Sequence, residues 1–264
     1  MQALIFIISI IIVASVIRAA VRKKIPLAQP GFEIEKQILG QHVFFYRQLT
    51  PEEKARFEES LQKFLQAVQI TGVKTTVEDM DMVFIAAAAI IPIFAFKDWQ
   101  YRNIHEVLLY PDSFDNDYRT TGNGRQTLGM VGNGPMQNVM ILSQQDLRNG
   151  FLNNHDKSNT AIHEFVHLVD KADGDTDGLP AALLAHQYAL PWLTRMHWEI
   201  QQIKSGKSDI NPYGAGNQAE FLAVAAEYFF KQPHLMQHKH PELFSMLQQI
   251  FTPVAATPKM TRPA

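Results

Sequence analysis

The chain has 264 residues, of which 46% are hydrophobic and 19% are charged, and its formal net charge is −2. This length suffices for one domain with a sizeable hydrophobic core and some additional segments. Acidic and basic residues are mixed along the sequence, so nucleic acid, which requires a basic patch or stripe, is not an expected partner. The absence of cysteine excludes disulfide scaffolds, thiolate metal sites and cysteine nucleophiles.

The N-terminus is apolar. Residues 1–17 contain no charged side chain, and basic residues follow at positions 18 and 22–24. At about 1.5 Å per residue, a helix of this length spans roughly 25 Å, near the lower limit for crossing a bilayer. We therefore expect residues 1–24 to form a transmembrane anchor with its basic flank. Because the basic cluster follows the apolar run, the positive-inside rule predicts that the rest of the chain faces the cytoplasm.

Two other interpretations of this segment stay open. A cleaved signal peptide fits less well, because no basic region precedes the apolar run. A buried core helix would make the protein cytoplasmic, without an anchor.

The next part of the chain begins with the segment 25–40, whose prolines and glycines predict a linker. The run Thr50-Pro51-Glu52-Glu53 predicts a helix start with a capping box, and apolar residues at helical spacing continue to Val68. A second helix is expected over 77–89. Short apolar runs predict strands at 92–96, 105–110 and 138–142, and the glycine-rich segment 118–133 predicts a loop.

The last part of the chain is predicted to be mostly helical. Helices are expected at 158–172, 180–203, 217–231 and 242–251. The sequence therefore predicts a helix-rich α+β domain with a small sheet over residues 41–252, followed by a flexible tail at 253–264.

The sequence His163-Glu164-Phe165-Val166-His167 indicates a metal site. The two histidines are four residues apart, so a helix presents both imidazoles on one face, where they can occupy two corners of a tetrahedral zinc site. Glu164 is suited to act as the general base on a zinc-activated water. A helix that carries these residues by coincidence is the alternative. The apolar neighbours argue against it, because buried histidines and a buried glutamate without partners would be costly.

An open catalytic zinc site needs a third protein ligand. Glu220 and Glu227 lie seven residues apart in an apolar segment, and therefore on the same helix face. One could bind zinc while the other orients a ligand histidine, and their spacing alone leaves the assignment open. Asp170, three residues after His167, could also orient a ligand histidine or lie on the helix surface. Tyr213 could stabilise an oxyanion near the metal.

Two segments carry a resemblance to a known family. HEFVHLVDKADGDTDGLP at 163–180 and YGAGNQAEFLAVAAEYFF at 213–230 resemble the Mlc titration factor A family of bacterial zinc peptidases. The upstream segments EVLLYPDSF and NVMILSQQDL are similar as well, so the resemblance extends over about residues 30–250. The same helix pair resembles the catalytic domain of anthrax lethal factor, a zincin-like fold of the gluzincin type.

The resemblance implies roles for individual residues. It implies that Glu220 is the third zinc ligand and that Tyr213 donates to the transition state, which leaves Asp170 and Glu227 as residues that orient ligands. It also implies aminopeptidase-like hydrolysis of peptide bonds with one Zn²⁺ ion. By fold analogy, residues 138–142, with Asn138, Val139 and Met140, are the expected edge strand that binds the substrate backbone.

The resemblance also implies an alternative function, because members of this family sequester a transcriptional repressor of sugar uptake. A chain anchored in the bacterial inner membrane could hold such a repressor at the bilayer, with catalysis secondary. The expected anchor departs from the family, whose compared member is soluble, and this puts the repressor partner in doubt. The two hypotheses therefore remain a zinc peptidase and a membrane-tethered binding protein.

Overall fold

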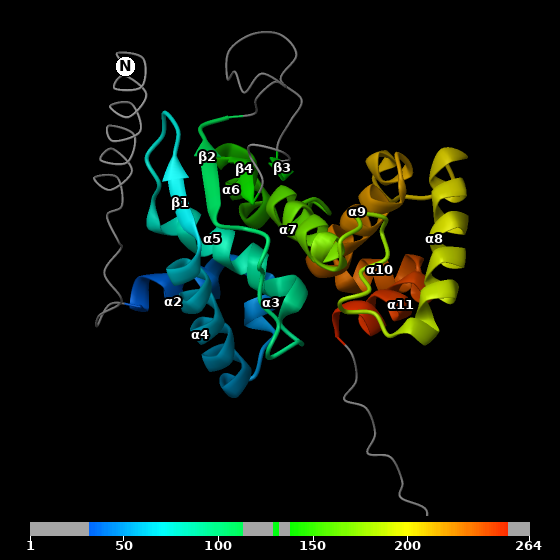
Figure 1. Cartoon of the computed structure of the whole chain (residues 1–264), viewed down its shortest axis with the longest axis horizontal. Coiled ribbons are helices and arrows are strands. Elements are labelled where there is room, and N and C mark those ends of the chain that lie inside the picture. Colours follow the sequence, from blue (N-terminus) through cyan, green and yellow to red (C-terminus); the bar gives the residue numbers. More distant parts are fainter. Residues whose placement is uncertain (1–31, 113–128, 132–137, 253–264) are drawn as a thin grey trace, which may run out of the picture. The chain divides into compact units, whose positions relative to one another are not determined.

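The computed structural model describes residues 32–112, 129–131 and 138–252 (Figure 1). The chain divides into two units, Met1–Phe32 and Glu33–Ala264, and the second carries all the elements described below. Within the described ranges, no helix combines the length and the apolar character that crossing a membrane requires. The predicted anchor at 1–24 and the predicted tail at 253–264 lie outside the described residues.

Over the described part of the chain, the sheet has four strands in the order β1-β2-β4-β3. Its strands are β1 (Gln69–Gly72), β2 (Glu106–Tyr110), β3 (Gly129–Val131) and β4 (Val139–Ser143). Strands β1, β2 and β4 are parallel, and β3 pairs antiparallel with β4. Met140, Ile141 and Leu142 of β4 are all at most 1% exposed, although their side chains alternate between the two faces. Burial on both faces is typical of a central strand covered by helices.

The prediction that residues 138–142 form an edge strand is wrong. Met140 of β4 pairs with Val107 of β2 on one side and with Val131 of β3 on the other. Asn138 precedes the strand and has a positive φ of 65°. The edge on this side of the sheet is β3, which consists of three residues within the segment predicted to be a loop.

The first helices precede β2 in the sequence and pack largely on one another, with the helix Asp79–Ile90 also packing against two helices that follow β4. They are α2 (Glu33–His42), α3 (Phe44–Arg47), α4 (Pro51–Ala67), α5 (Asp79–Ile90) and the short 3-10 helix η1 (Ile91–Ile93). The predicted capping box is confirmed, because the Thr50 hydroxyl accepts from the Glu53 N–H and the Glu53 carboxylate accepts from the Thr50 N–H. Residues 33–40, predicted as linker, are helical instead, and Leu39 is fully buried. The predicted strand 92–96 is also wrong, since Pro92 lies in η1 directly after α5.

The remaining helices follow β4. They are α6 (Gln144–Leu152), α7 (Thr160–Asp170), η3 (Lys171–Asp173), η4 (His186–Tyr188), α8 (Ala189–Lys204), η5 (Pro212–Ala215), α9 (Gln218–Lys231), α10 (Pro233–Lys239) and α11 (Pro241–Phe251). Helix α6 was not predicted. The helix predicted over 180–203 begins only at Ala189, because Pro191 is tolerated in a first turn but not in a helix interior.

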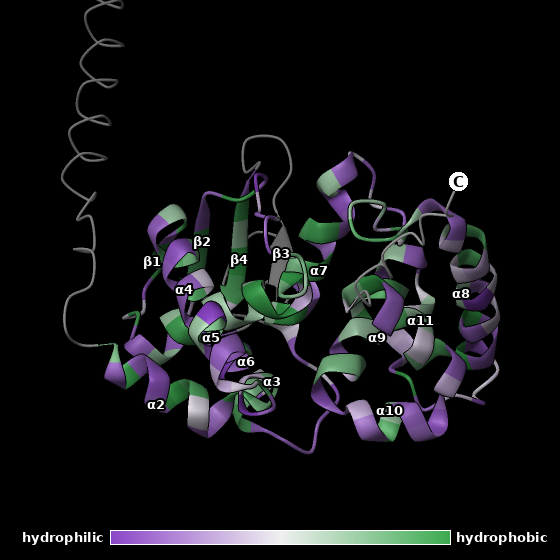
Figure 2. Ribbon diagram, turned by 90° about the horizontal axis from the view of Figure 1, so that it is seen from below, coloured by the Kyte–Doolittle hydropathy of each residue, from purple (hydrophilic) through white to green (hydrophobic). Residues whose placement is uncertain are grey.

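Helices α7 and α9 pack against each other, and both contribute to the hydrophobic core (Figure 1). In Figure 2, the residues of β4 and α7 are mainly hydrophobic, whereas α8 and α10 contain more hydrophilic residues. Helix α9 is buried along its whole length from Phe221 to Phe230. Its two carboxylates, Glu220 and Glu227, are therefore held by a rigid and largely apolar helix.

Candidate metal centre

Helix α7 fixes the two histidines. Its N-cap is Asn159, whose side-chain oxygen accepts the Ile162 N–H at 3.0 Å and so satisfies a free donor of the first turn. The helix is buried on nearly all sides, and His163 and Glu164 are only 8% and 7% exposed. One turn separates His163 from His167, and their ring centroids are 4.7 Å apart.

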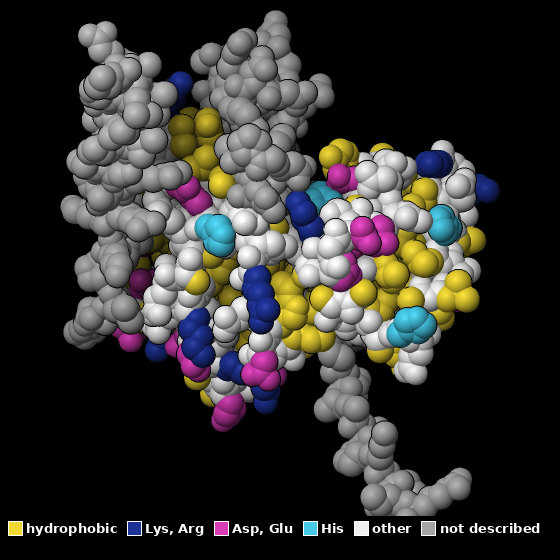
Figure 3. Space-filling model, viewed as in Figure 1, with side chains coloured by type: hydrophobic (Ala, Val, Ile, Leu, Met, Phe, Trp, Pro, Cys, Tyr) yellow, Lys and Arg dark blue, Asp and Glu magenta, His cyan; other side chains and the backbone are white. Residues whose placement is uncertain are grey.

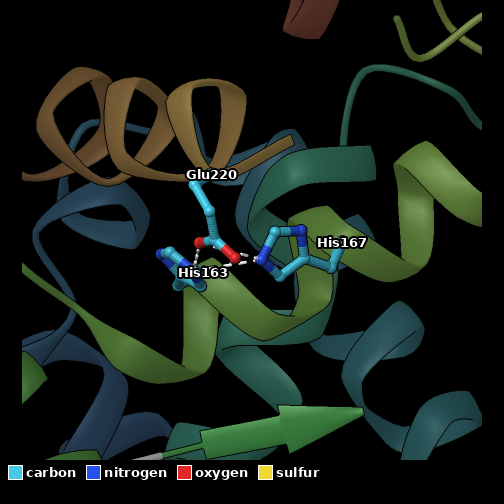
Figure 4. A group of neighbouring side chains, drawn as sticks. All are labelled: His163, His167 and Glu220. Carbon is cyan, nitrogen blue, oxygen red and sulfur yellow. Dashed lines mark hydrogen bonds and ion pairs between the residues drawn. The ribbon is translucent and has the colours of Figure 1, made fainter. Parts of the chain in front are cut away.

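Glu220 reaches these histidines from the first turn of α9. That helix begins after Asn217, whose side chain accepts the Glu220 N–H at 2.9 Å. The Glu220 carboxylate lies 3.0 Å from His163 Nε2 and 3.5 Å from His167 Nε2, and the two Nε2 atoms are 3.1 Å apart. Figure 4 shows the three side chains pointing toward one another. Three groups of types that ligate metals thus converge from two helices.

The spacing of these donors fits a tetrahedral metal ion. Bonds of about 2.0–2.2 Å at tetrahedral angles place neighbouring donor atoms roughly 3.3 Å apart. The three observed separations, 3.0, 3.1 and 3.5 Å, lie close to that value. Two imidazole nitrogens and one carboxylate oxygen also match the donor set that zinc takes in peptidases. His163, His167 and Glu220 could therefore hold a metal ion and leave a fourth position open.

Glu227 occupies a different place from Glu220. Its Oε1 lies 2.7 Å from His163 Nδ1, and its Oε2 accepts the backbone N–H of Asn159 at 2.5 Å. With a metal ion at the donor group, Nδ1 of His163 would donate its proton to Glu227, and the Nε2 lone pair would face the ion. The geometry thus separates the two carboxylates, which their spacing alone left interchangeable and of which the resemblance implied Glu220 as the ligand.

The local electrostatics favour a cation between these groups. Burial disfavours the charged form of His163, but hydrogen bonds to Glu220 and Glu227 outweigh it and raise its pKa to about 10. Burial likewise disfavours the Glu220 carboxylate, yet its hydrogen bonds to His163 and His167 lower its pKa to about 2. The carboxylates on both sides of His163 thus favour a positive charge between them, which a divalent ion can supply.

Glu164 and Tyr213 lie beside the donor group. Burial raises the pKa of Glu164, although His163 and His167 oppose that rise. Tyr213, in η5, is 61% exposed, and its ring centroid lies 5.9 Å from that of His163. Partial burial and the carboxylates of Glu220 and Glu164 raise the pKa of Tyr213. The structure thus brings the predicted base and the predicted oxyanion donor to the same site.

Asp170 contacts the backbone rather than a ligand histidine. Its Oδ2 accepts the Gly178 N–H at 2.8 Å. Among the described residues, its Oδ1 and the Nδ1 of His167 are both buried without a hydrogen-bond partner. The predicted hydrogen bond from a ligand histidine to the Asp170 carboxylate is therefore not formed in this structure.

Gly178 connects three elements around the site. Beside its bond to Asp170 at the end of α7, its carbonyl accepts the indole N–H of Trp192 in α8 at 2.7 Å. A Cβ at Gly178 would lie 2.4 Å from the Gln218 carbonyl oxygen at the start of α9. The sequence interpretation missed both Gly178 and Trp192, because neither spacing nor residue type links them to the histidines.

The sequence interpretation also missed Asn159, although its position at the start of the predicted helix indicates an N-cap. An asparagine directly before a buried helix is a typical N-cap, and this one ties α7 to Glu227. Of the predicted edge-strand residues, Asn138 directly precedes interior strand β4, and Val139 and Met140 begin it. Helix α7 contacts both β3 and β4, so the edge strand next to the site is β3.

Comparison with known proteins supports a family assignment. An uncharacterized protein of Synechocystis sp. is 30% identical over 225 residues, covering 81% of this chain and 82% of the relative. Mlc titration factor A of Escherichia fergusonii is 28% identical over 220 residues, and that of Salmonella gallinarum 27%, each alignment covering 77% of this chain and 80% of the relative. The family described as glucose-regulated metallo-peptidase M90 matches residues 17–252, so this chain belongs to the M90 metallopeptidase family.

Proposed function

We propose that this protein is a zinc-dependent peptidase with aminopeptidase-like activity. The observation that carries the proposal is the convergence of His163, His167 and Glu220 with donor separations close to those of a tetrahedral ion. The family membership supports the same reaction class. Zinc at these donors would supply Lewis-acid chemistry, polarising a peptide carbonyl and lowering the pKa of water.

The other steps of hydrolysis are carried out by side chains around the metal site. Glu164, buried beside the donors, takes a proton from the attacking water and passes it to the leaving amine. Tyr213, exposed at the same site, donates a hydrogen bond to the developing oxyanion. Glu227 keeps the His163 ring in the tautomer and orientation that a ligand needs. Among the described residues, strand β3 next to α7 forms the edge of the sheet to which an extended substrate backbone would add.

Glu164→Gln tests the role of the general base. An amide of the same size cannot accept a proton, so hydrolysis of aminoacyl and peptide substrates should fall by at least about 100-fold. Zinc content should stay unchanged, because Glu164 is not among the donors. The matched control is Glu52→Gln, which changes an exposed glutamate at the start of α4. Undiminished hydrolysis by Glu164→Gln would exclude this mechanism.

A second candidate function is binding of a transcriptional repressor. It is favoured by the name Mlc titration factor A, which several relatives carry. The test is to measure binding of the Mlc repressor to the purified full chain and to Glu164→Gln. Equal affinities would assign binding to a surface independent of catalysis, and no measurable binding to either would rule this function out.

The apolar N-terminus supports a further part of the proposal. We place the full chain at the bacterial inner membrane through residues 1–24, with the metal centre on the cytoplasmic side. Cell fractionation of the full chain and of a chain without residues 1–24 tests this. Only the full chain should sediment with membranes, and recovery of both in the soluble fraction would favour the cytoplasmic alternative.

A further inference from the structure

A cavity lies away from the candidate metal centre, between α4 and the segment 90–101. Its volume is about 120 Å³. The apolar part of its lining includes five aromatic residues, which are Phe64, Phe94, Phe96, Trp99 and Tyr101. A cavity of about 150 Å³ lined by apolar side chains is known to bind benzene, so this one has room for a single ring or a compact aliphatic group.

The inner wall of the cavity is held in place by the core. The rings of Phe64 and Tyr101 pack against Phe165 of α7, with centroid distances of 5.6 and 5.4 Å. The Tyr101 hydroxyl donates to the Ala89 carbonyl at 2.8 Å, and Trp99 meets Tyr101 edge to face. The cavity is therefore formed before any ligand enters, which lowers the cost of binding.

The rim of the cavity is positively charged. Arg56, Lys63 and Lys97 line it, and no aspartate or glutamate does so among the described residues. Arg56 is fixed by a 2.6 Å bond to the Phe94 carbonyl, and Lys63 pairs with the exposed Glu59 outside the lining. Lys97 is exposed. Figure 3 shows Lys and Arg side chains beside hydrophobic ones over the region of α4.

We propose that this cavity binds a small organic carboxylate whose body is an aromatic ring or a compact aliphatic group. The apolar body would fill the aromatic interior, and the carboxylate would remain at the mouth beside the cations. A cation is disfavoured there because three positive side chains and, among the described residues, no acidic ones line the cavity. This site is separate from the metal centre, and its existence does not depend on peptidase activity.

The test compares three ligands that share one body. Titration calorimetry on the purified full chain would use 3-phenylpropionate, 3-phenylpropanol and 3-phenylpropylamine. We expect saturable one-to-one binding of the acid, binding of the alcohol at least about 5-fold weaker, and none of the amine. Equal affinity for acid and alcohol, or no binding of the acid, would overturn the proposal.

Two variants locate the binding. Lys63→Gln combined with Lys97→Gln should weaken acid binding about 5-fold and leave alcohol binding unchanged, because only the acid uses the rim charges. The control is Lys204→Gln with Lys207→Gln, an equal loss of charge at exposed lysines outside the cavity. Ala67→Phe, at the exposed end of α4, should block both ligands. Acid binding that is weakened equally by the control pair, or that survives Ala67→Phe, would place the ligand elsewhere.

Discussion

Glu227 shows how a single residue can organise the candidate centre. It joins the N-cap of α7 to the first histidine, through the Asn159 N–H and His163 Nδ1. Both bonds are buried, and a carboxylate can accept both, whereas an amide can accept only with its oxygen. The residue therefore affects the metal through the histidine it orients.

We predict that Glu227→Gln weakens zinc binding by about 10- to 100-fold, the usual effect of losing a partner of a ligand histidine. Competition with a chelating dye measures this affinity in the purified full chain. The exposed Glu52→Gln serves as the control and should bind zinc as the unaltered chain does. Unchanged affinity in Glu227→Gln would mean that His163 is oriented without this carboxylate.

Gly178 offers a second test at the scale of one residue. Its φ is +77°, and an added Cβ would meet the backbone of Gln218 and Ala219, directly before Glu220. Gly178→Ala should therefore lower the free energy of unfolding by about 1–3 kcal/mol and also weaken zinc binding. Gly206→Ala is the matched control, because φ is +69° there but no atom lies within 4 Å. If both variants lost the same stability and zinc affinity, the contact with α9 would have no role.

Residue spacing predicted the helix that carries the candidate metal ligands but did not distinguish the two carboxylates of α9; only the family resemblance implied Glu220 as the ligand. His163 and His167 were predictable because their spacing alone puts them on one face. Glu220 and Glu227 also lie on one face of a helix, so helical periodicity predicts either of them equally well as the third ligand. Their difference arises from tertiary packing, since Glu220 lies in the first turn of α9 while Glu227 lies two turns deeper, against the start of α7.

At the scale of elements, a charge cluster holds several helices together. Asp209, between α8 and η5, accepts from Lys157 before α7 at 2.6 Å, from Lys239 of α10 at 2.8 Å and lies 2.7 Å from His240. The Tyr228 hydroxyl of α9 also donates to it at 3.2 Å. Burial alone would raise the pKa of Asp209, but the hydrogen bonds from the three cationic side chains hold it well below its ordinary value.

This cluster predicts a pH dependence of stability. Because the pKa of Asp209 is lower in the folded chain, its contribution is complete above the unfolded pKa of about 3.9 and is lost as pH falls below it. Asp209→Asn should therefore reduce the free energy of unfolding by about 1–3 kcal/mol at pH 7 and by much less near pH 2. Urea denaturation at several pH values measures this difference.

The control for this experiment is Asp175→Asn, in an exposed turn. It should change stability little at any pH. A deficit in Asp209→Asn that is constant from pH 7 to pH 2 would show that its charge is not the source of stability.

Elements were predicted well where their periodicity is strong and poorly where it is weak. The start of helix α4 is marked in the sequence by the N-cap Thr50 and by Pro51 in the first turn. Helix α9 has a mainly apolar sequence. Strand β3 is three residues in a glycine-rich segment and carries no alternation, so β4 was mistaken for an edge. The strand β1 is likewise short, and its sequence QITG lacks a hydrophobic pattern. In both cases pairing with a neighbour, rather than local sequence, determines the strand.

At the scale of the whole molecule, the candidate centre joins parts of the chain that are distant in sequence. His163 and His167 come from α7, and Glu220 from α9, with α8 and the turn at Gly178 between them. A metal ion would cross-link these segments and stabilise the folded state by mass action. Chelation should therefore lower the melting temperature, and added zinc should restore it.

The most direct test of the account is the zinc content of the purified full chain by native mass spectrometry. We predict one Zn²⁺ per chain, retained in Glu164→Gln and lost or strongly reduced in Glu220→Gln. The three carboxylates at the site would then have three separable roles, with Glu227→Gln giving an intermediate loss. A chain that binds no zinc when zinc is supplied, or that binds it equally well after Glu220→Gln, would contradict the account.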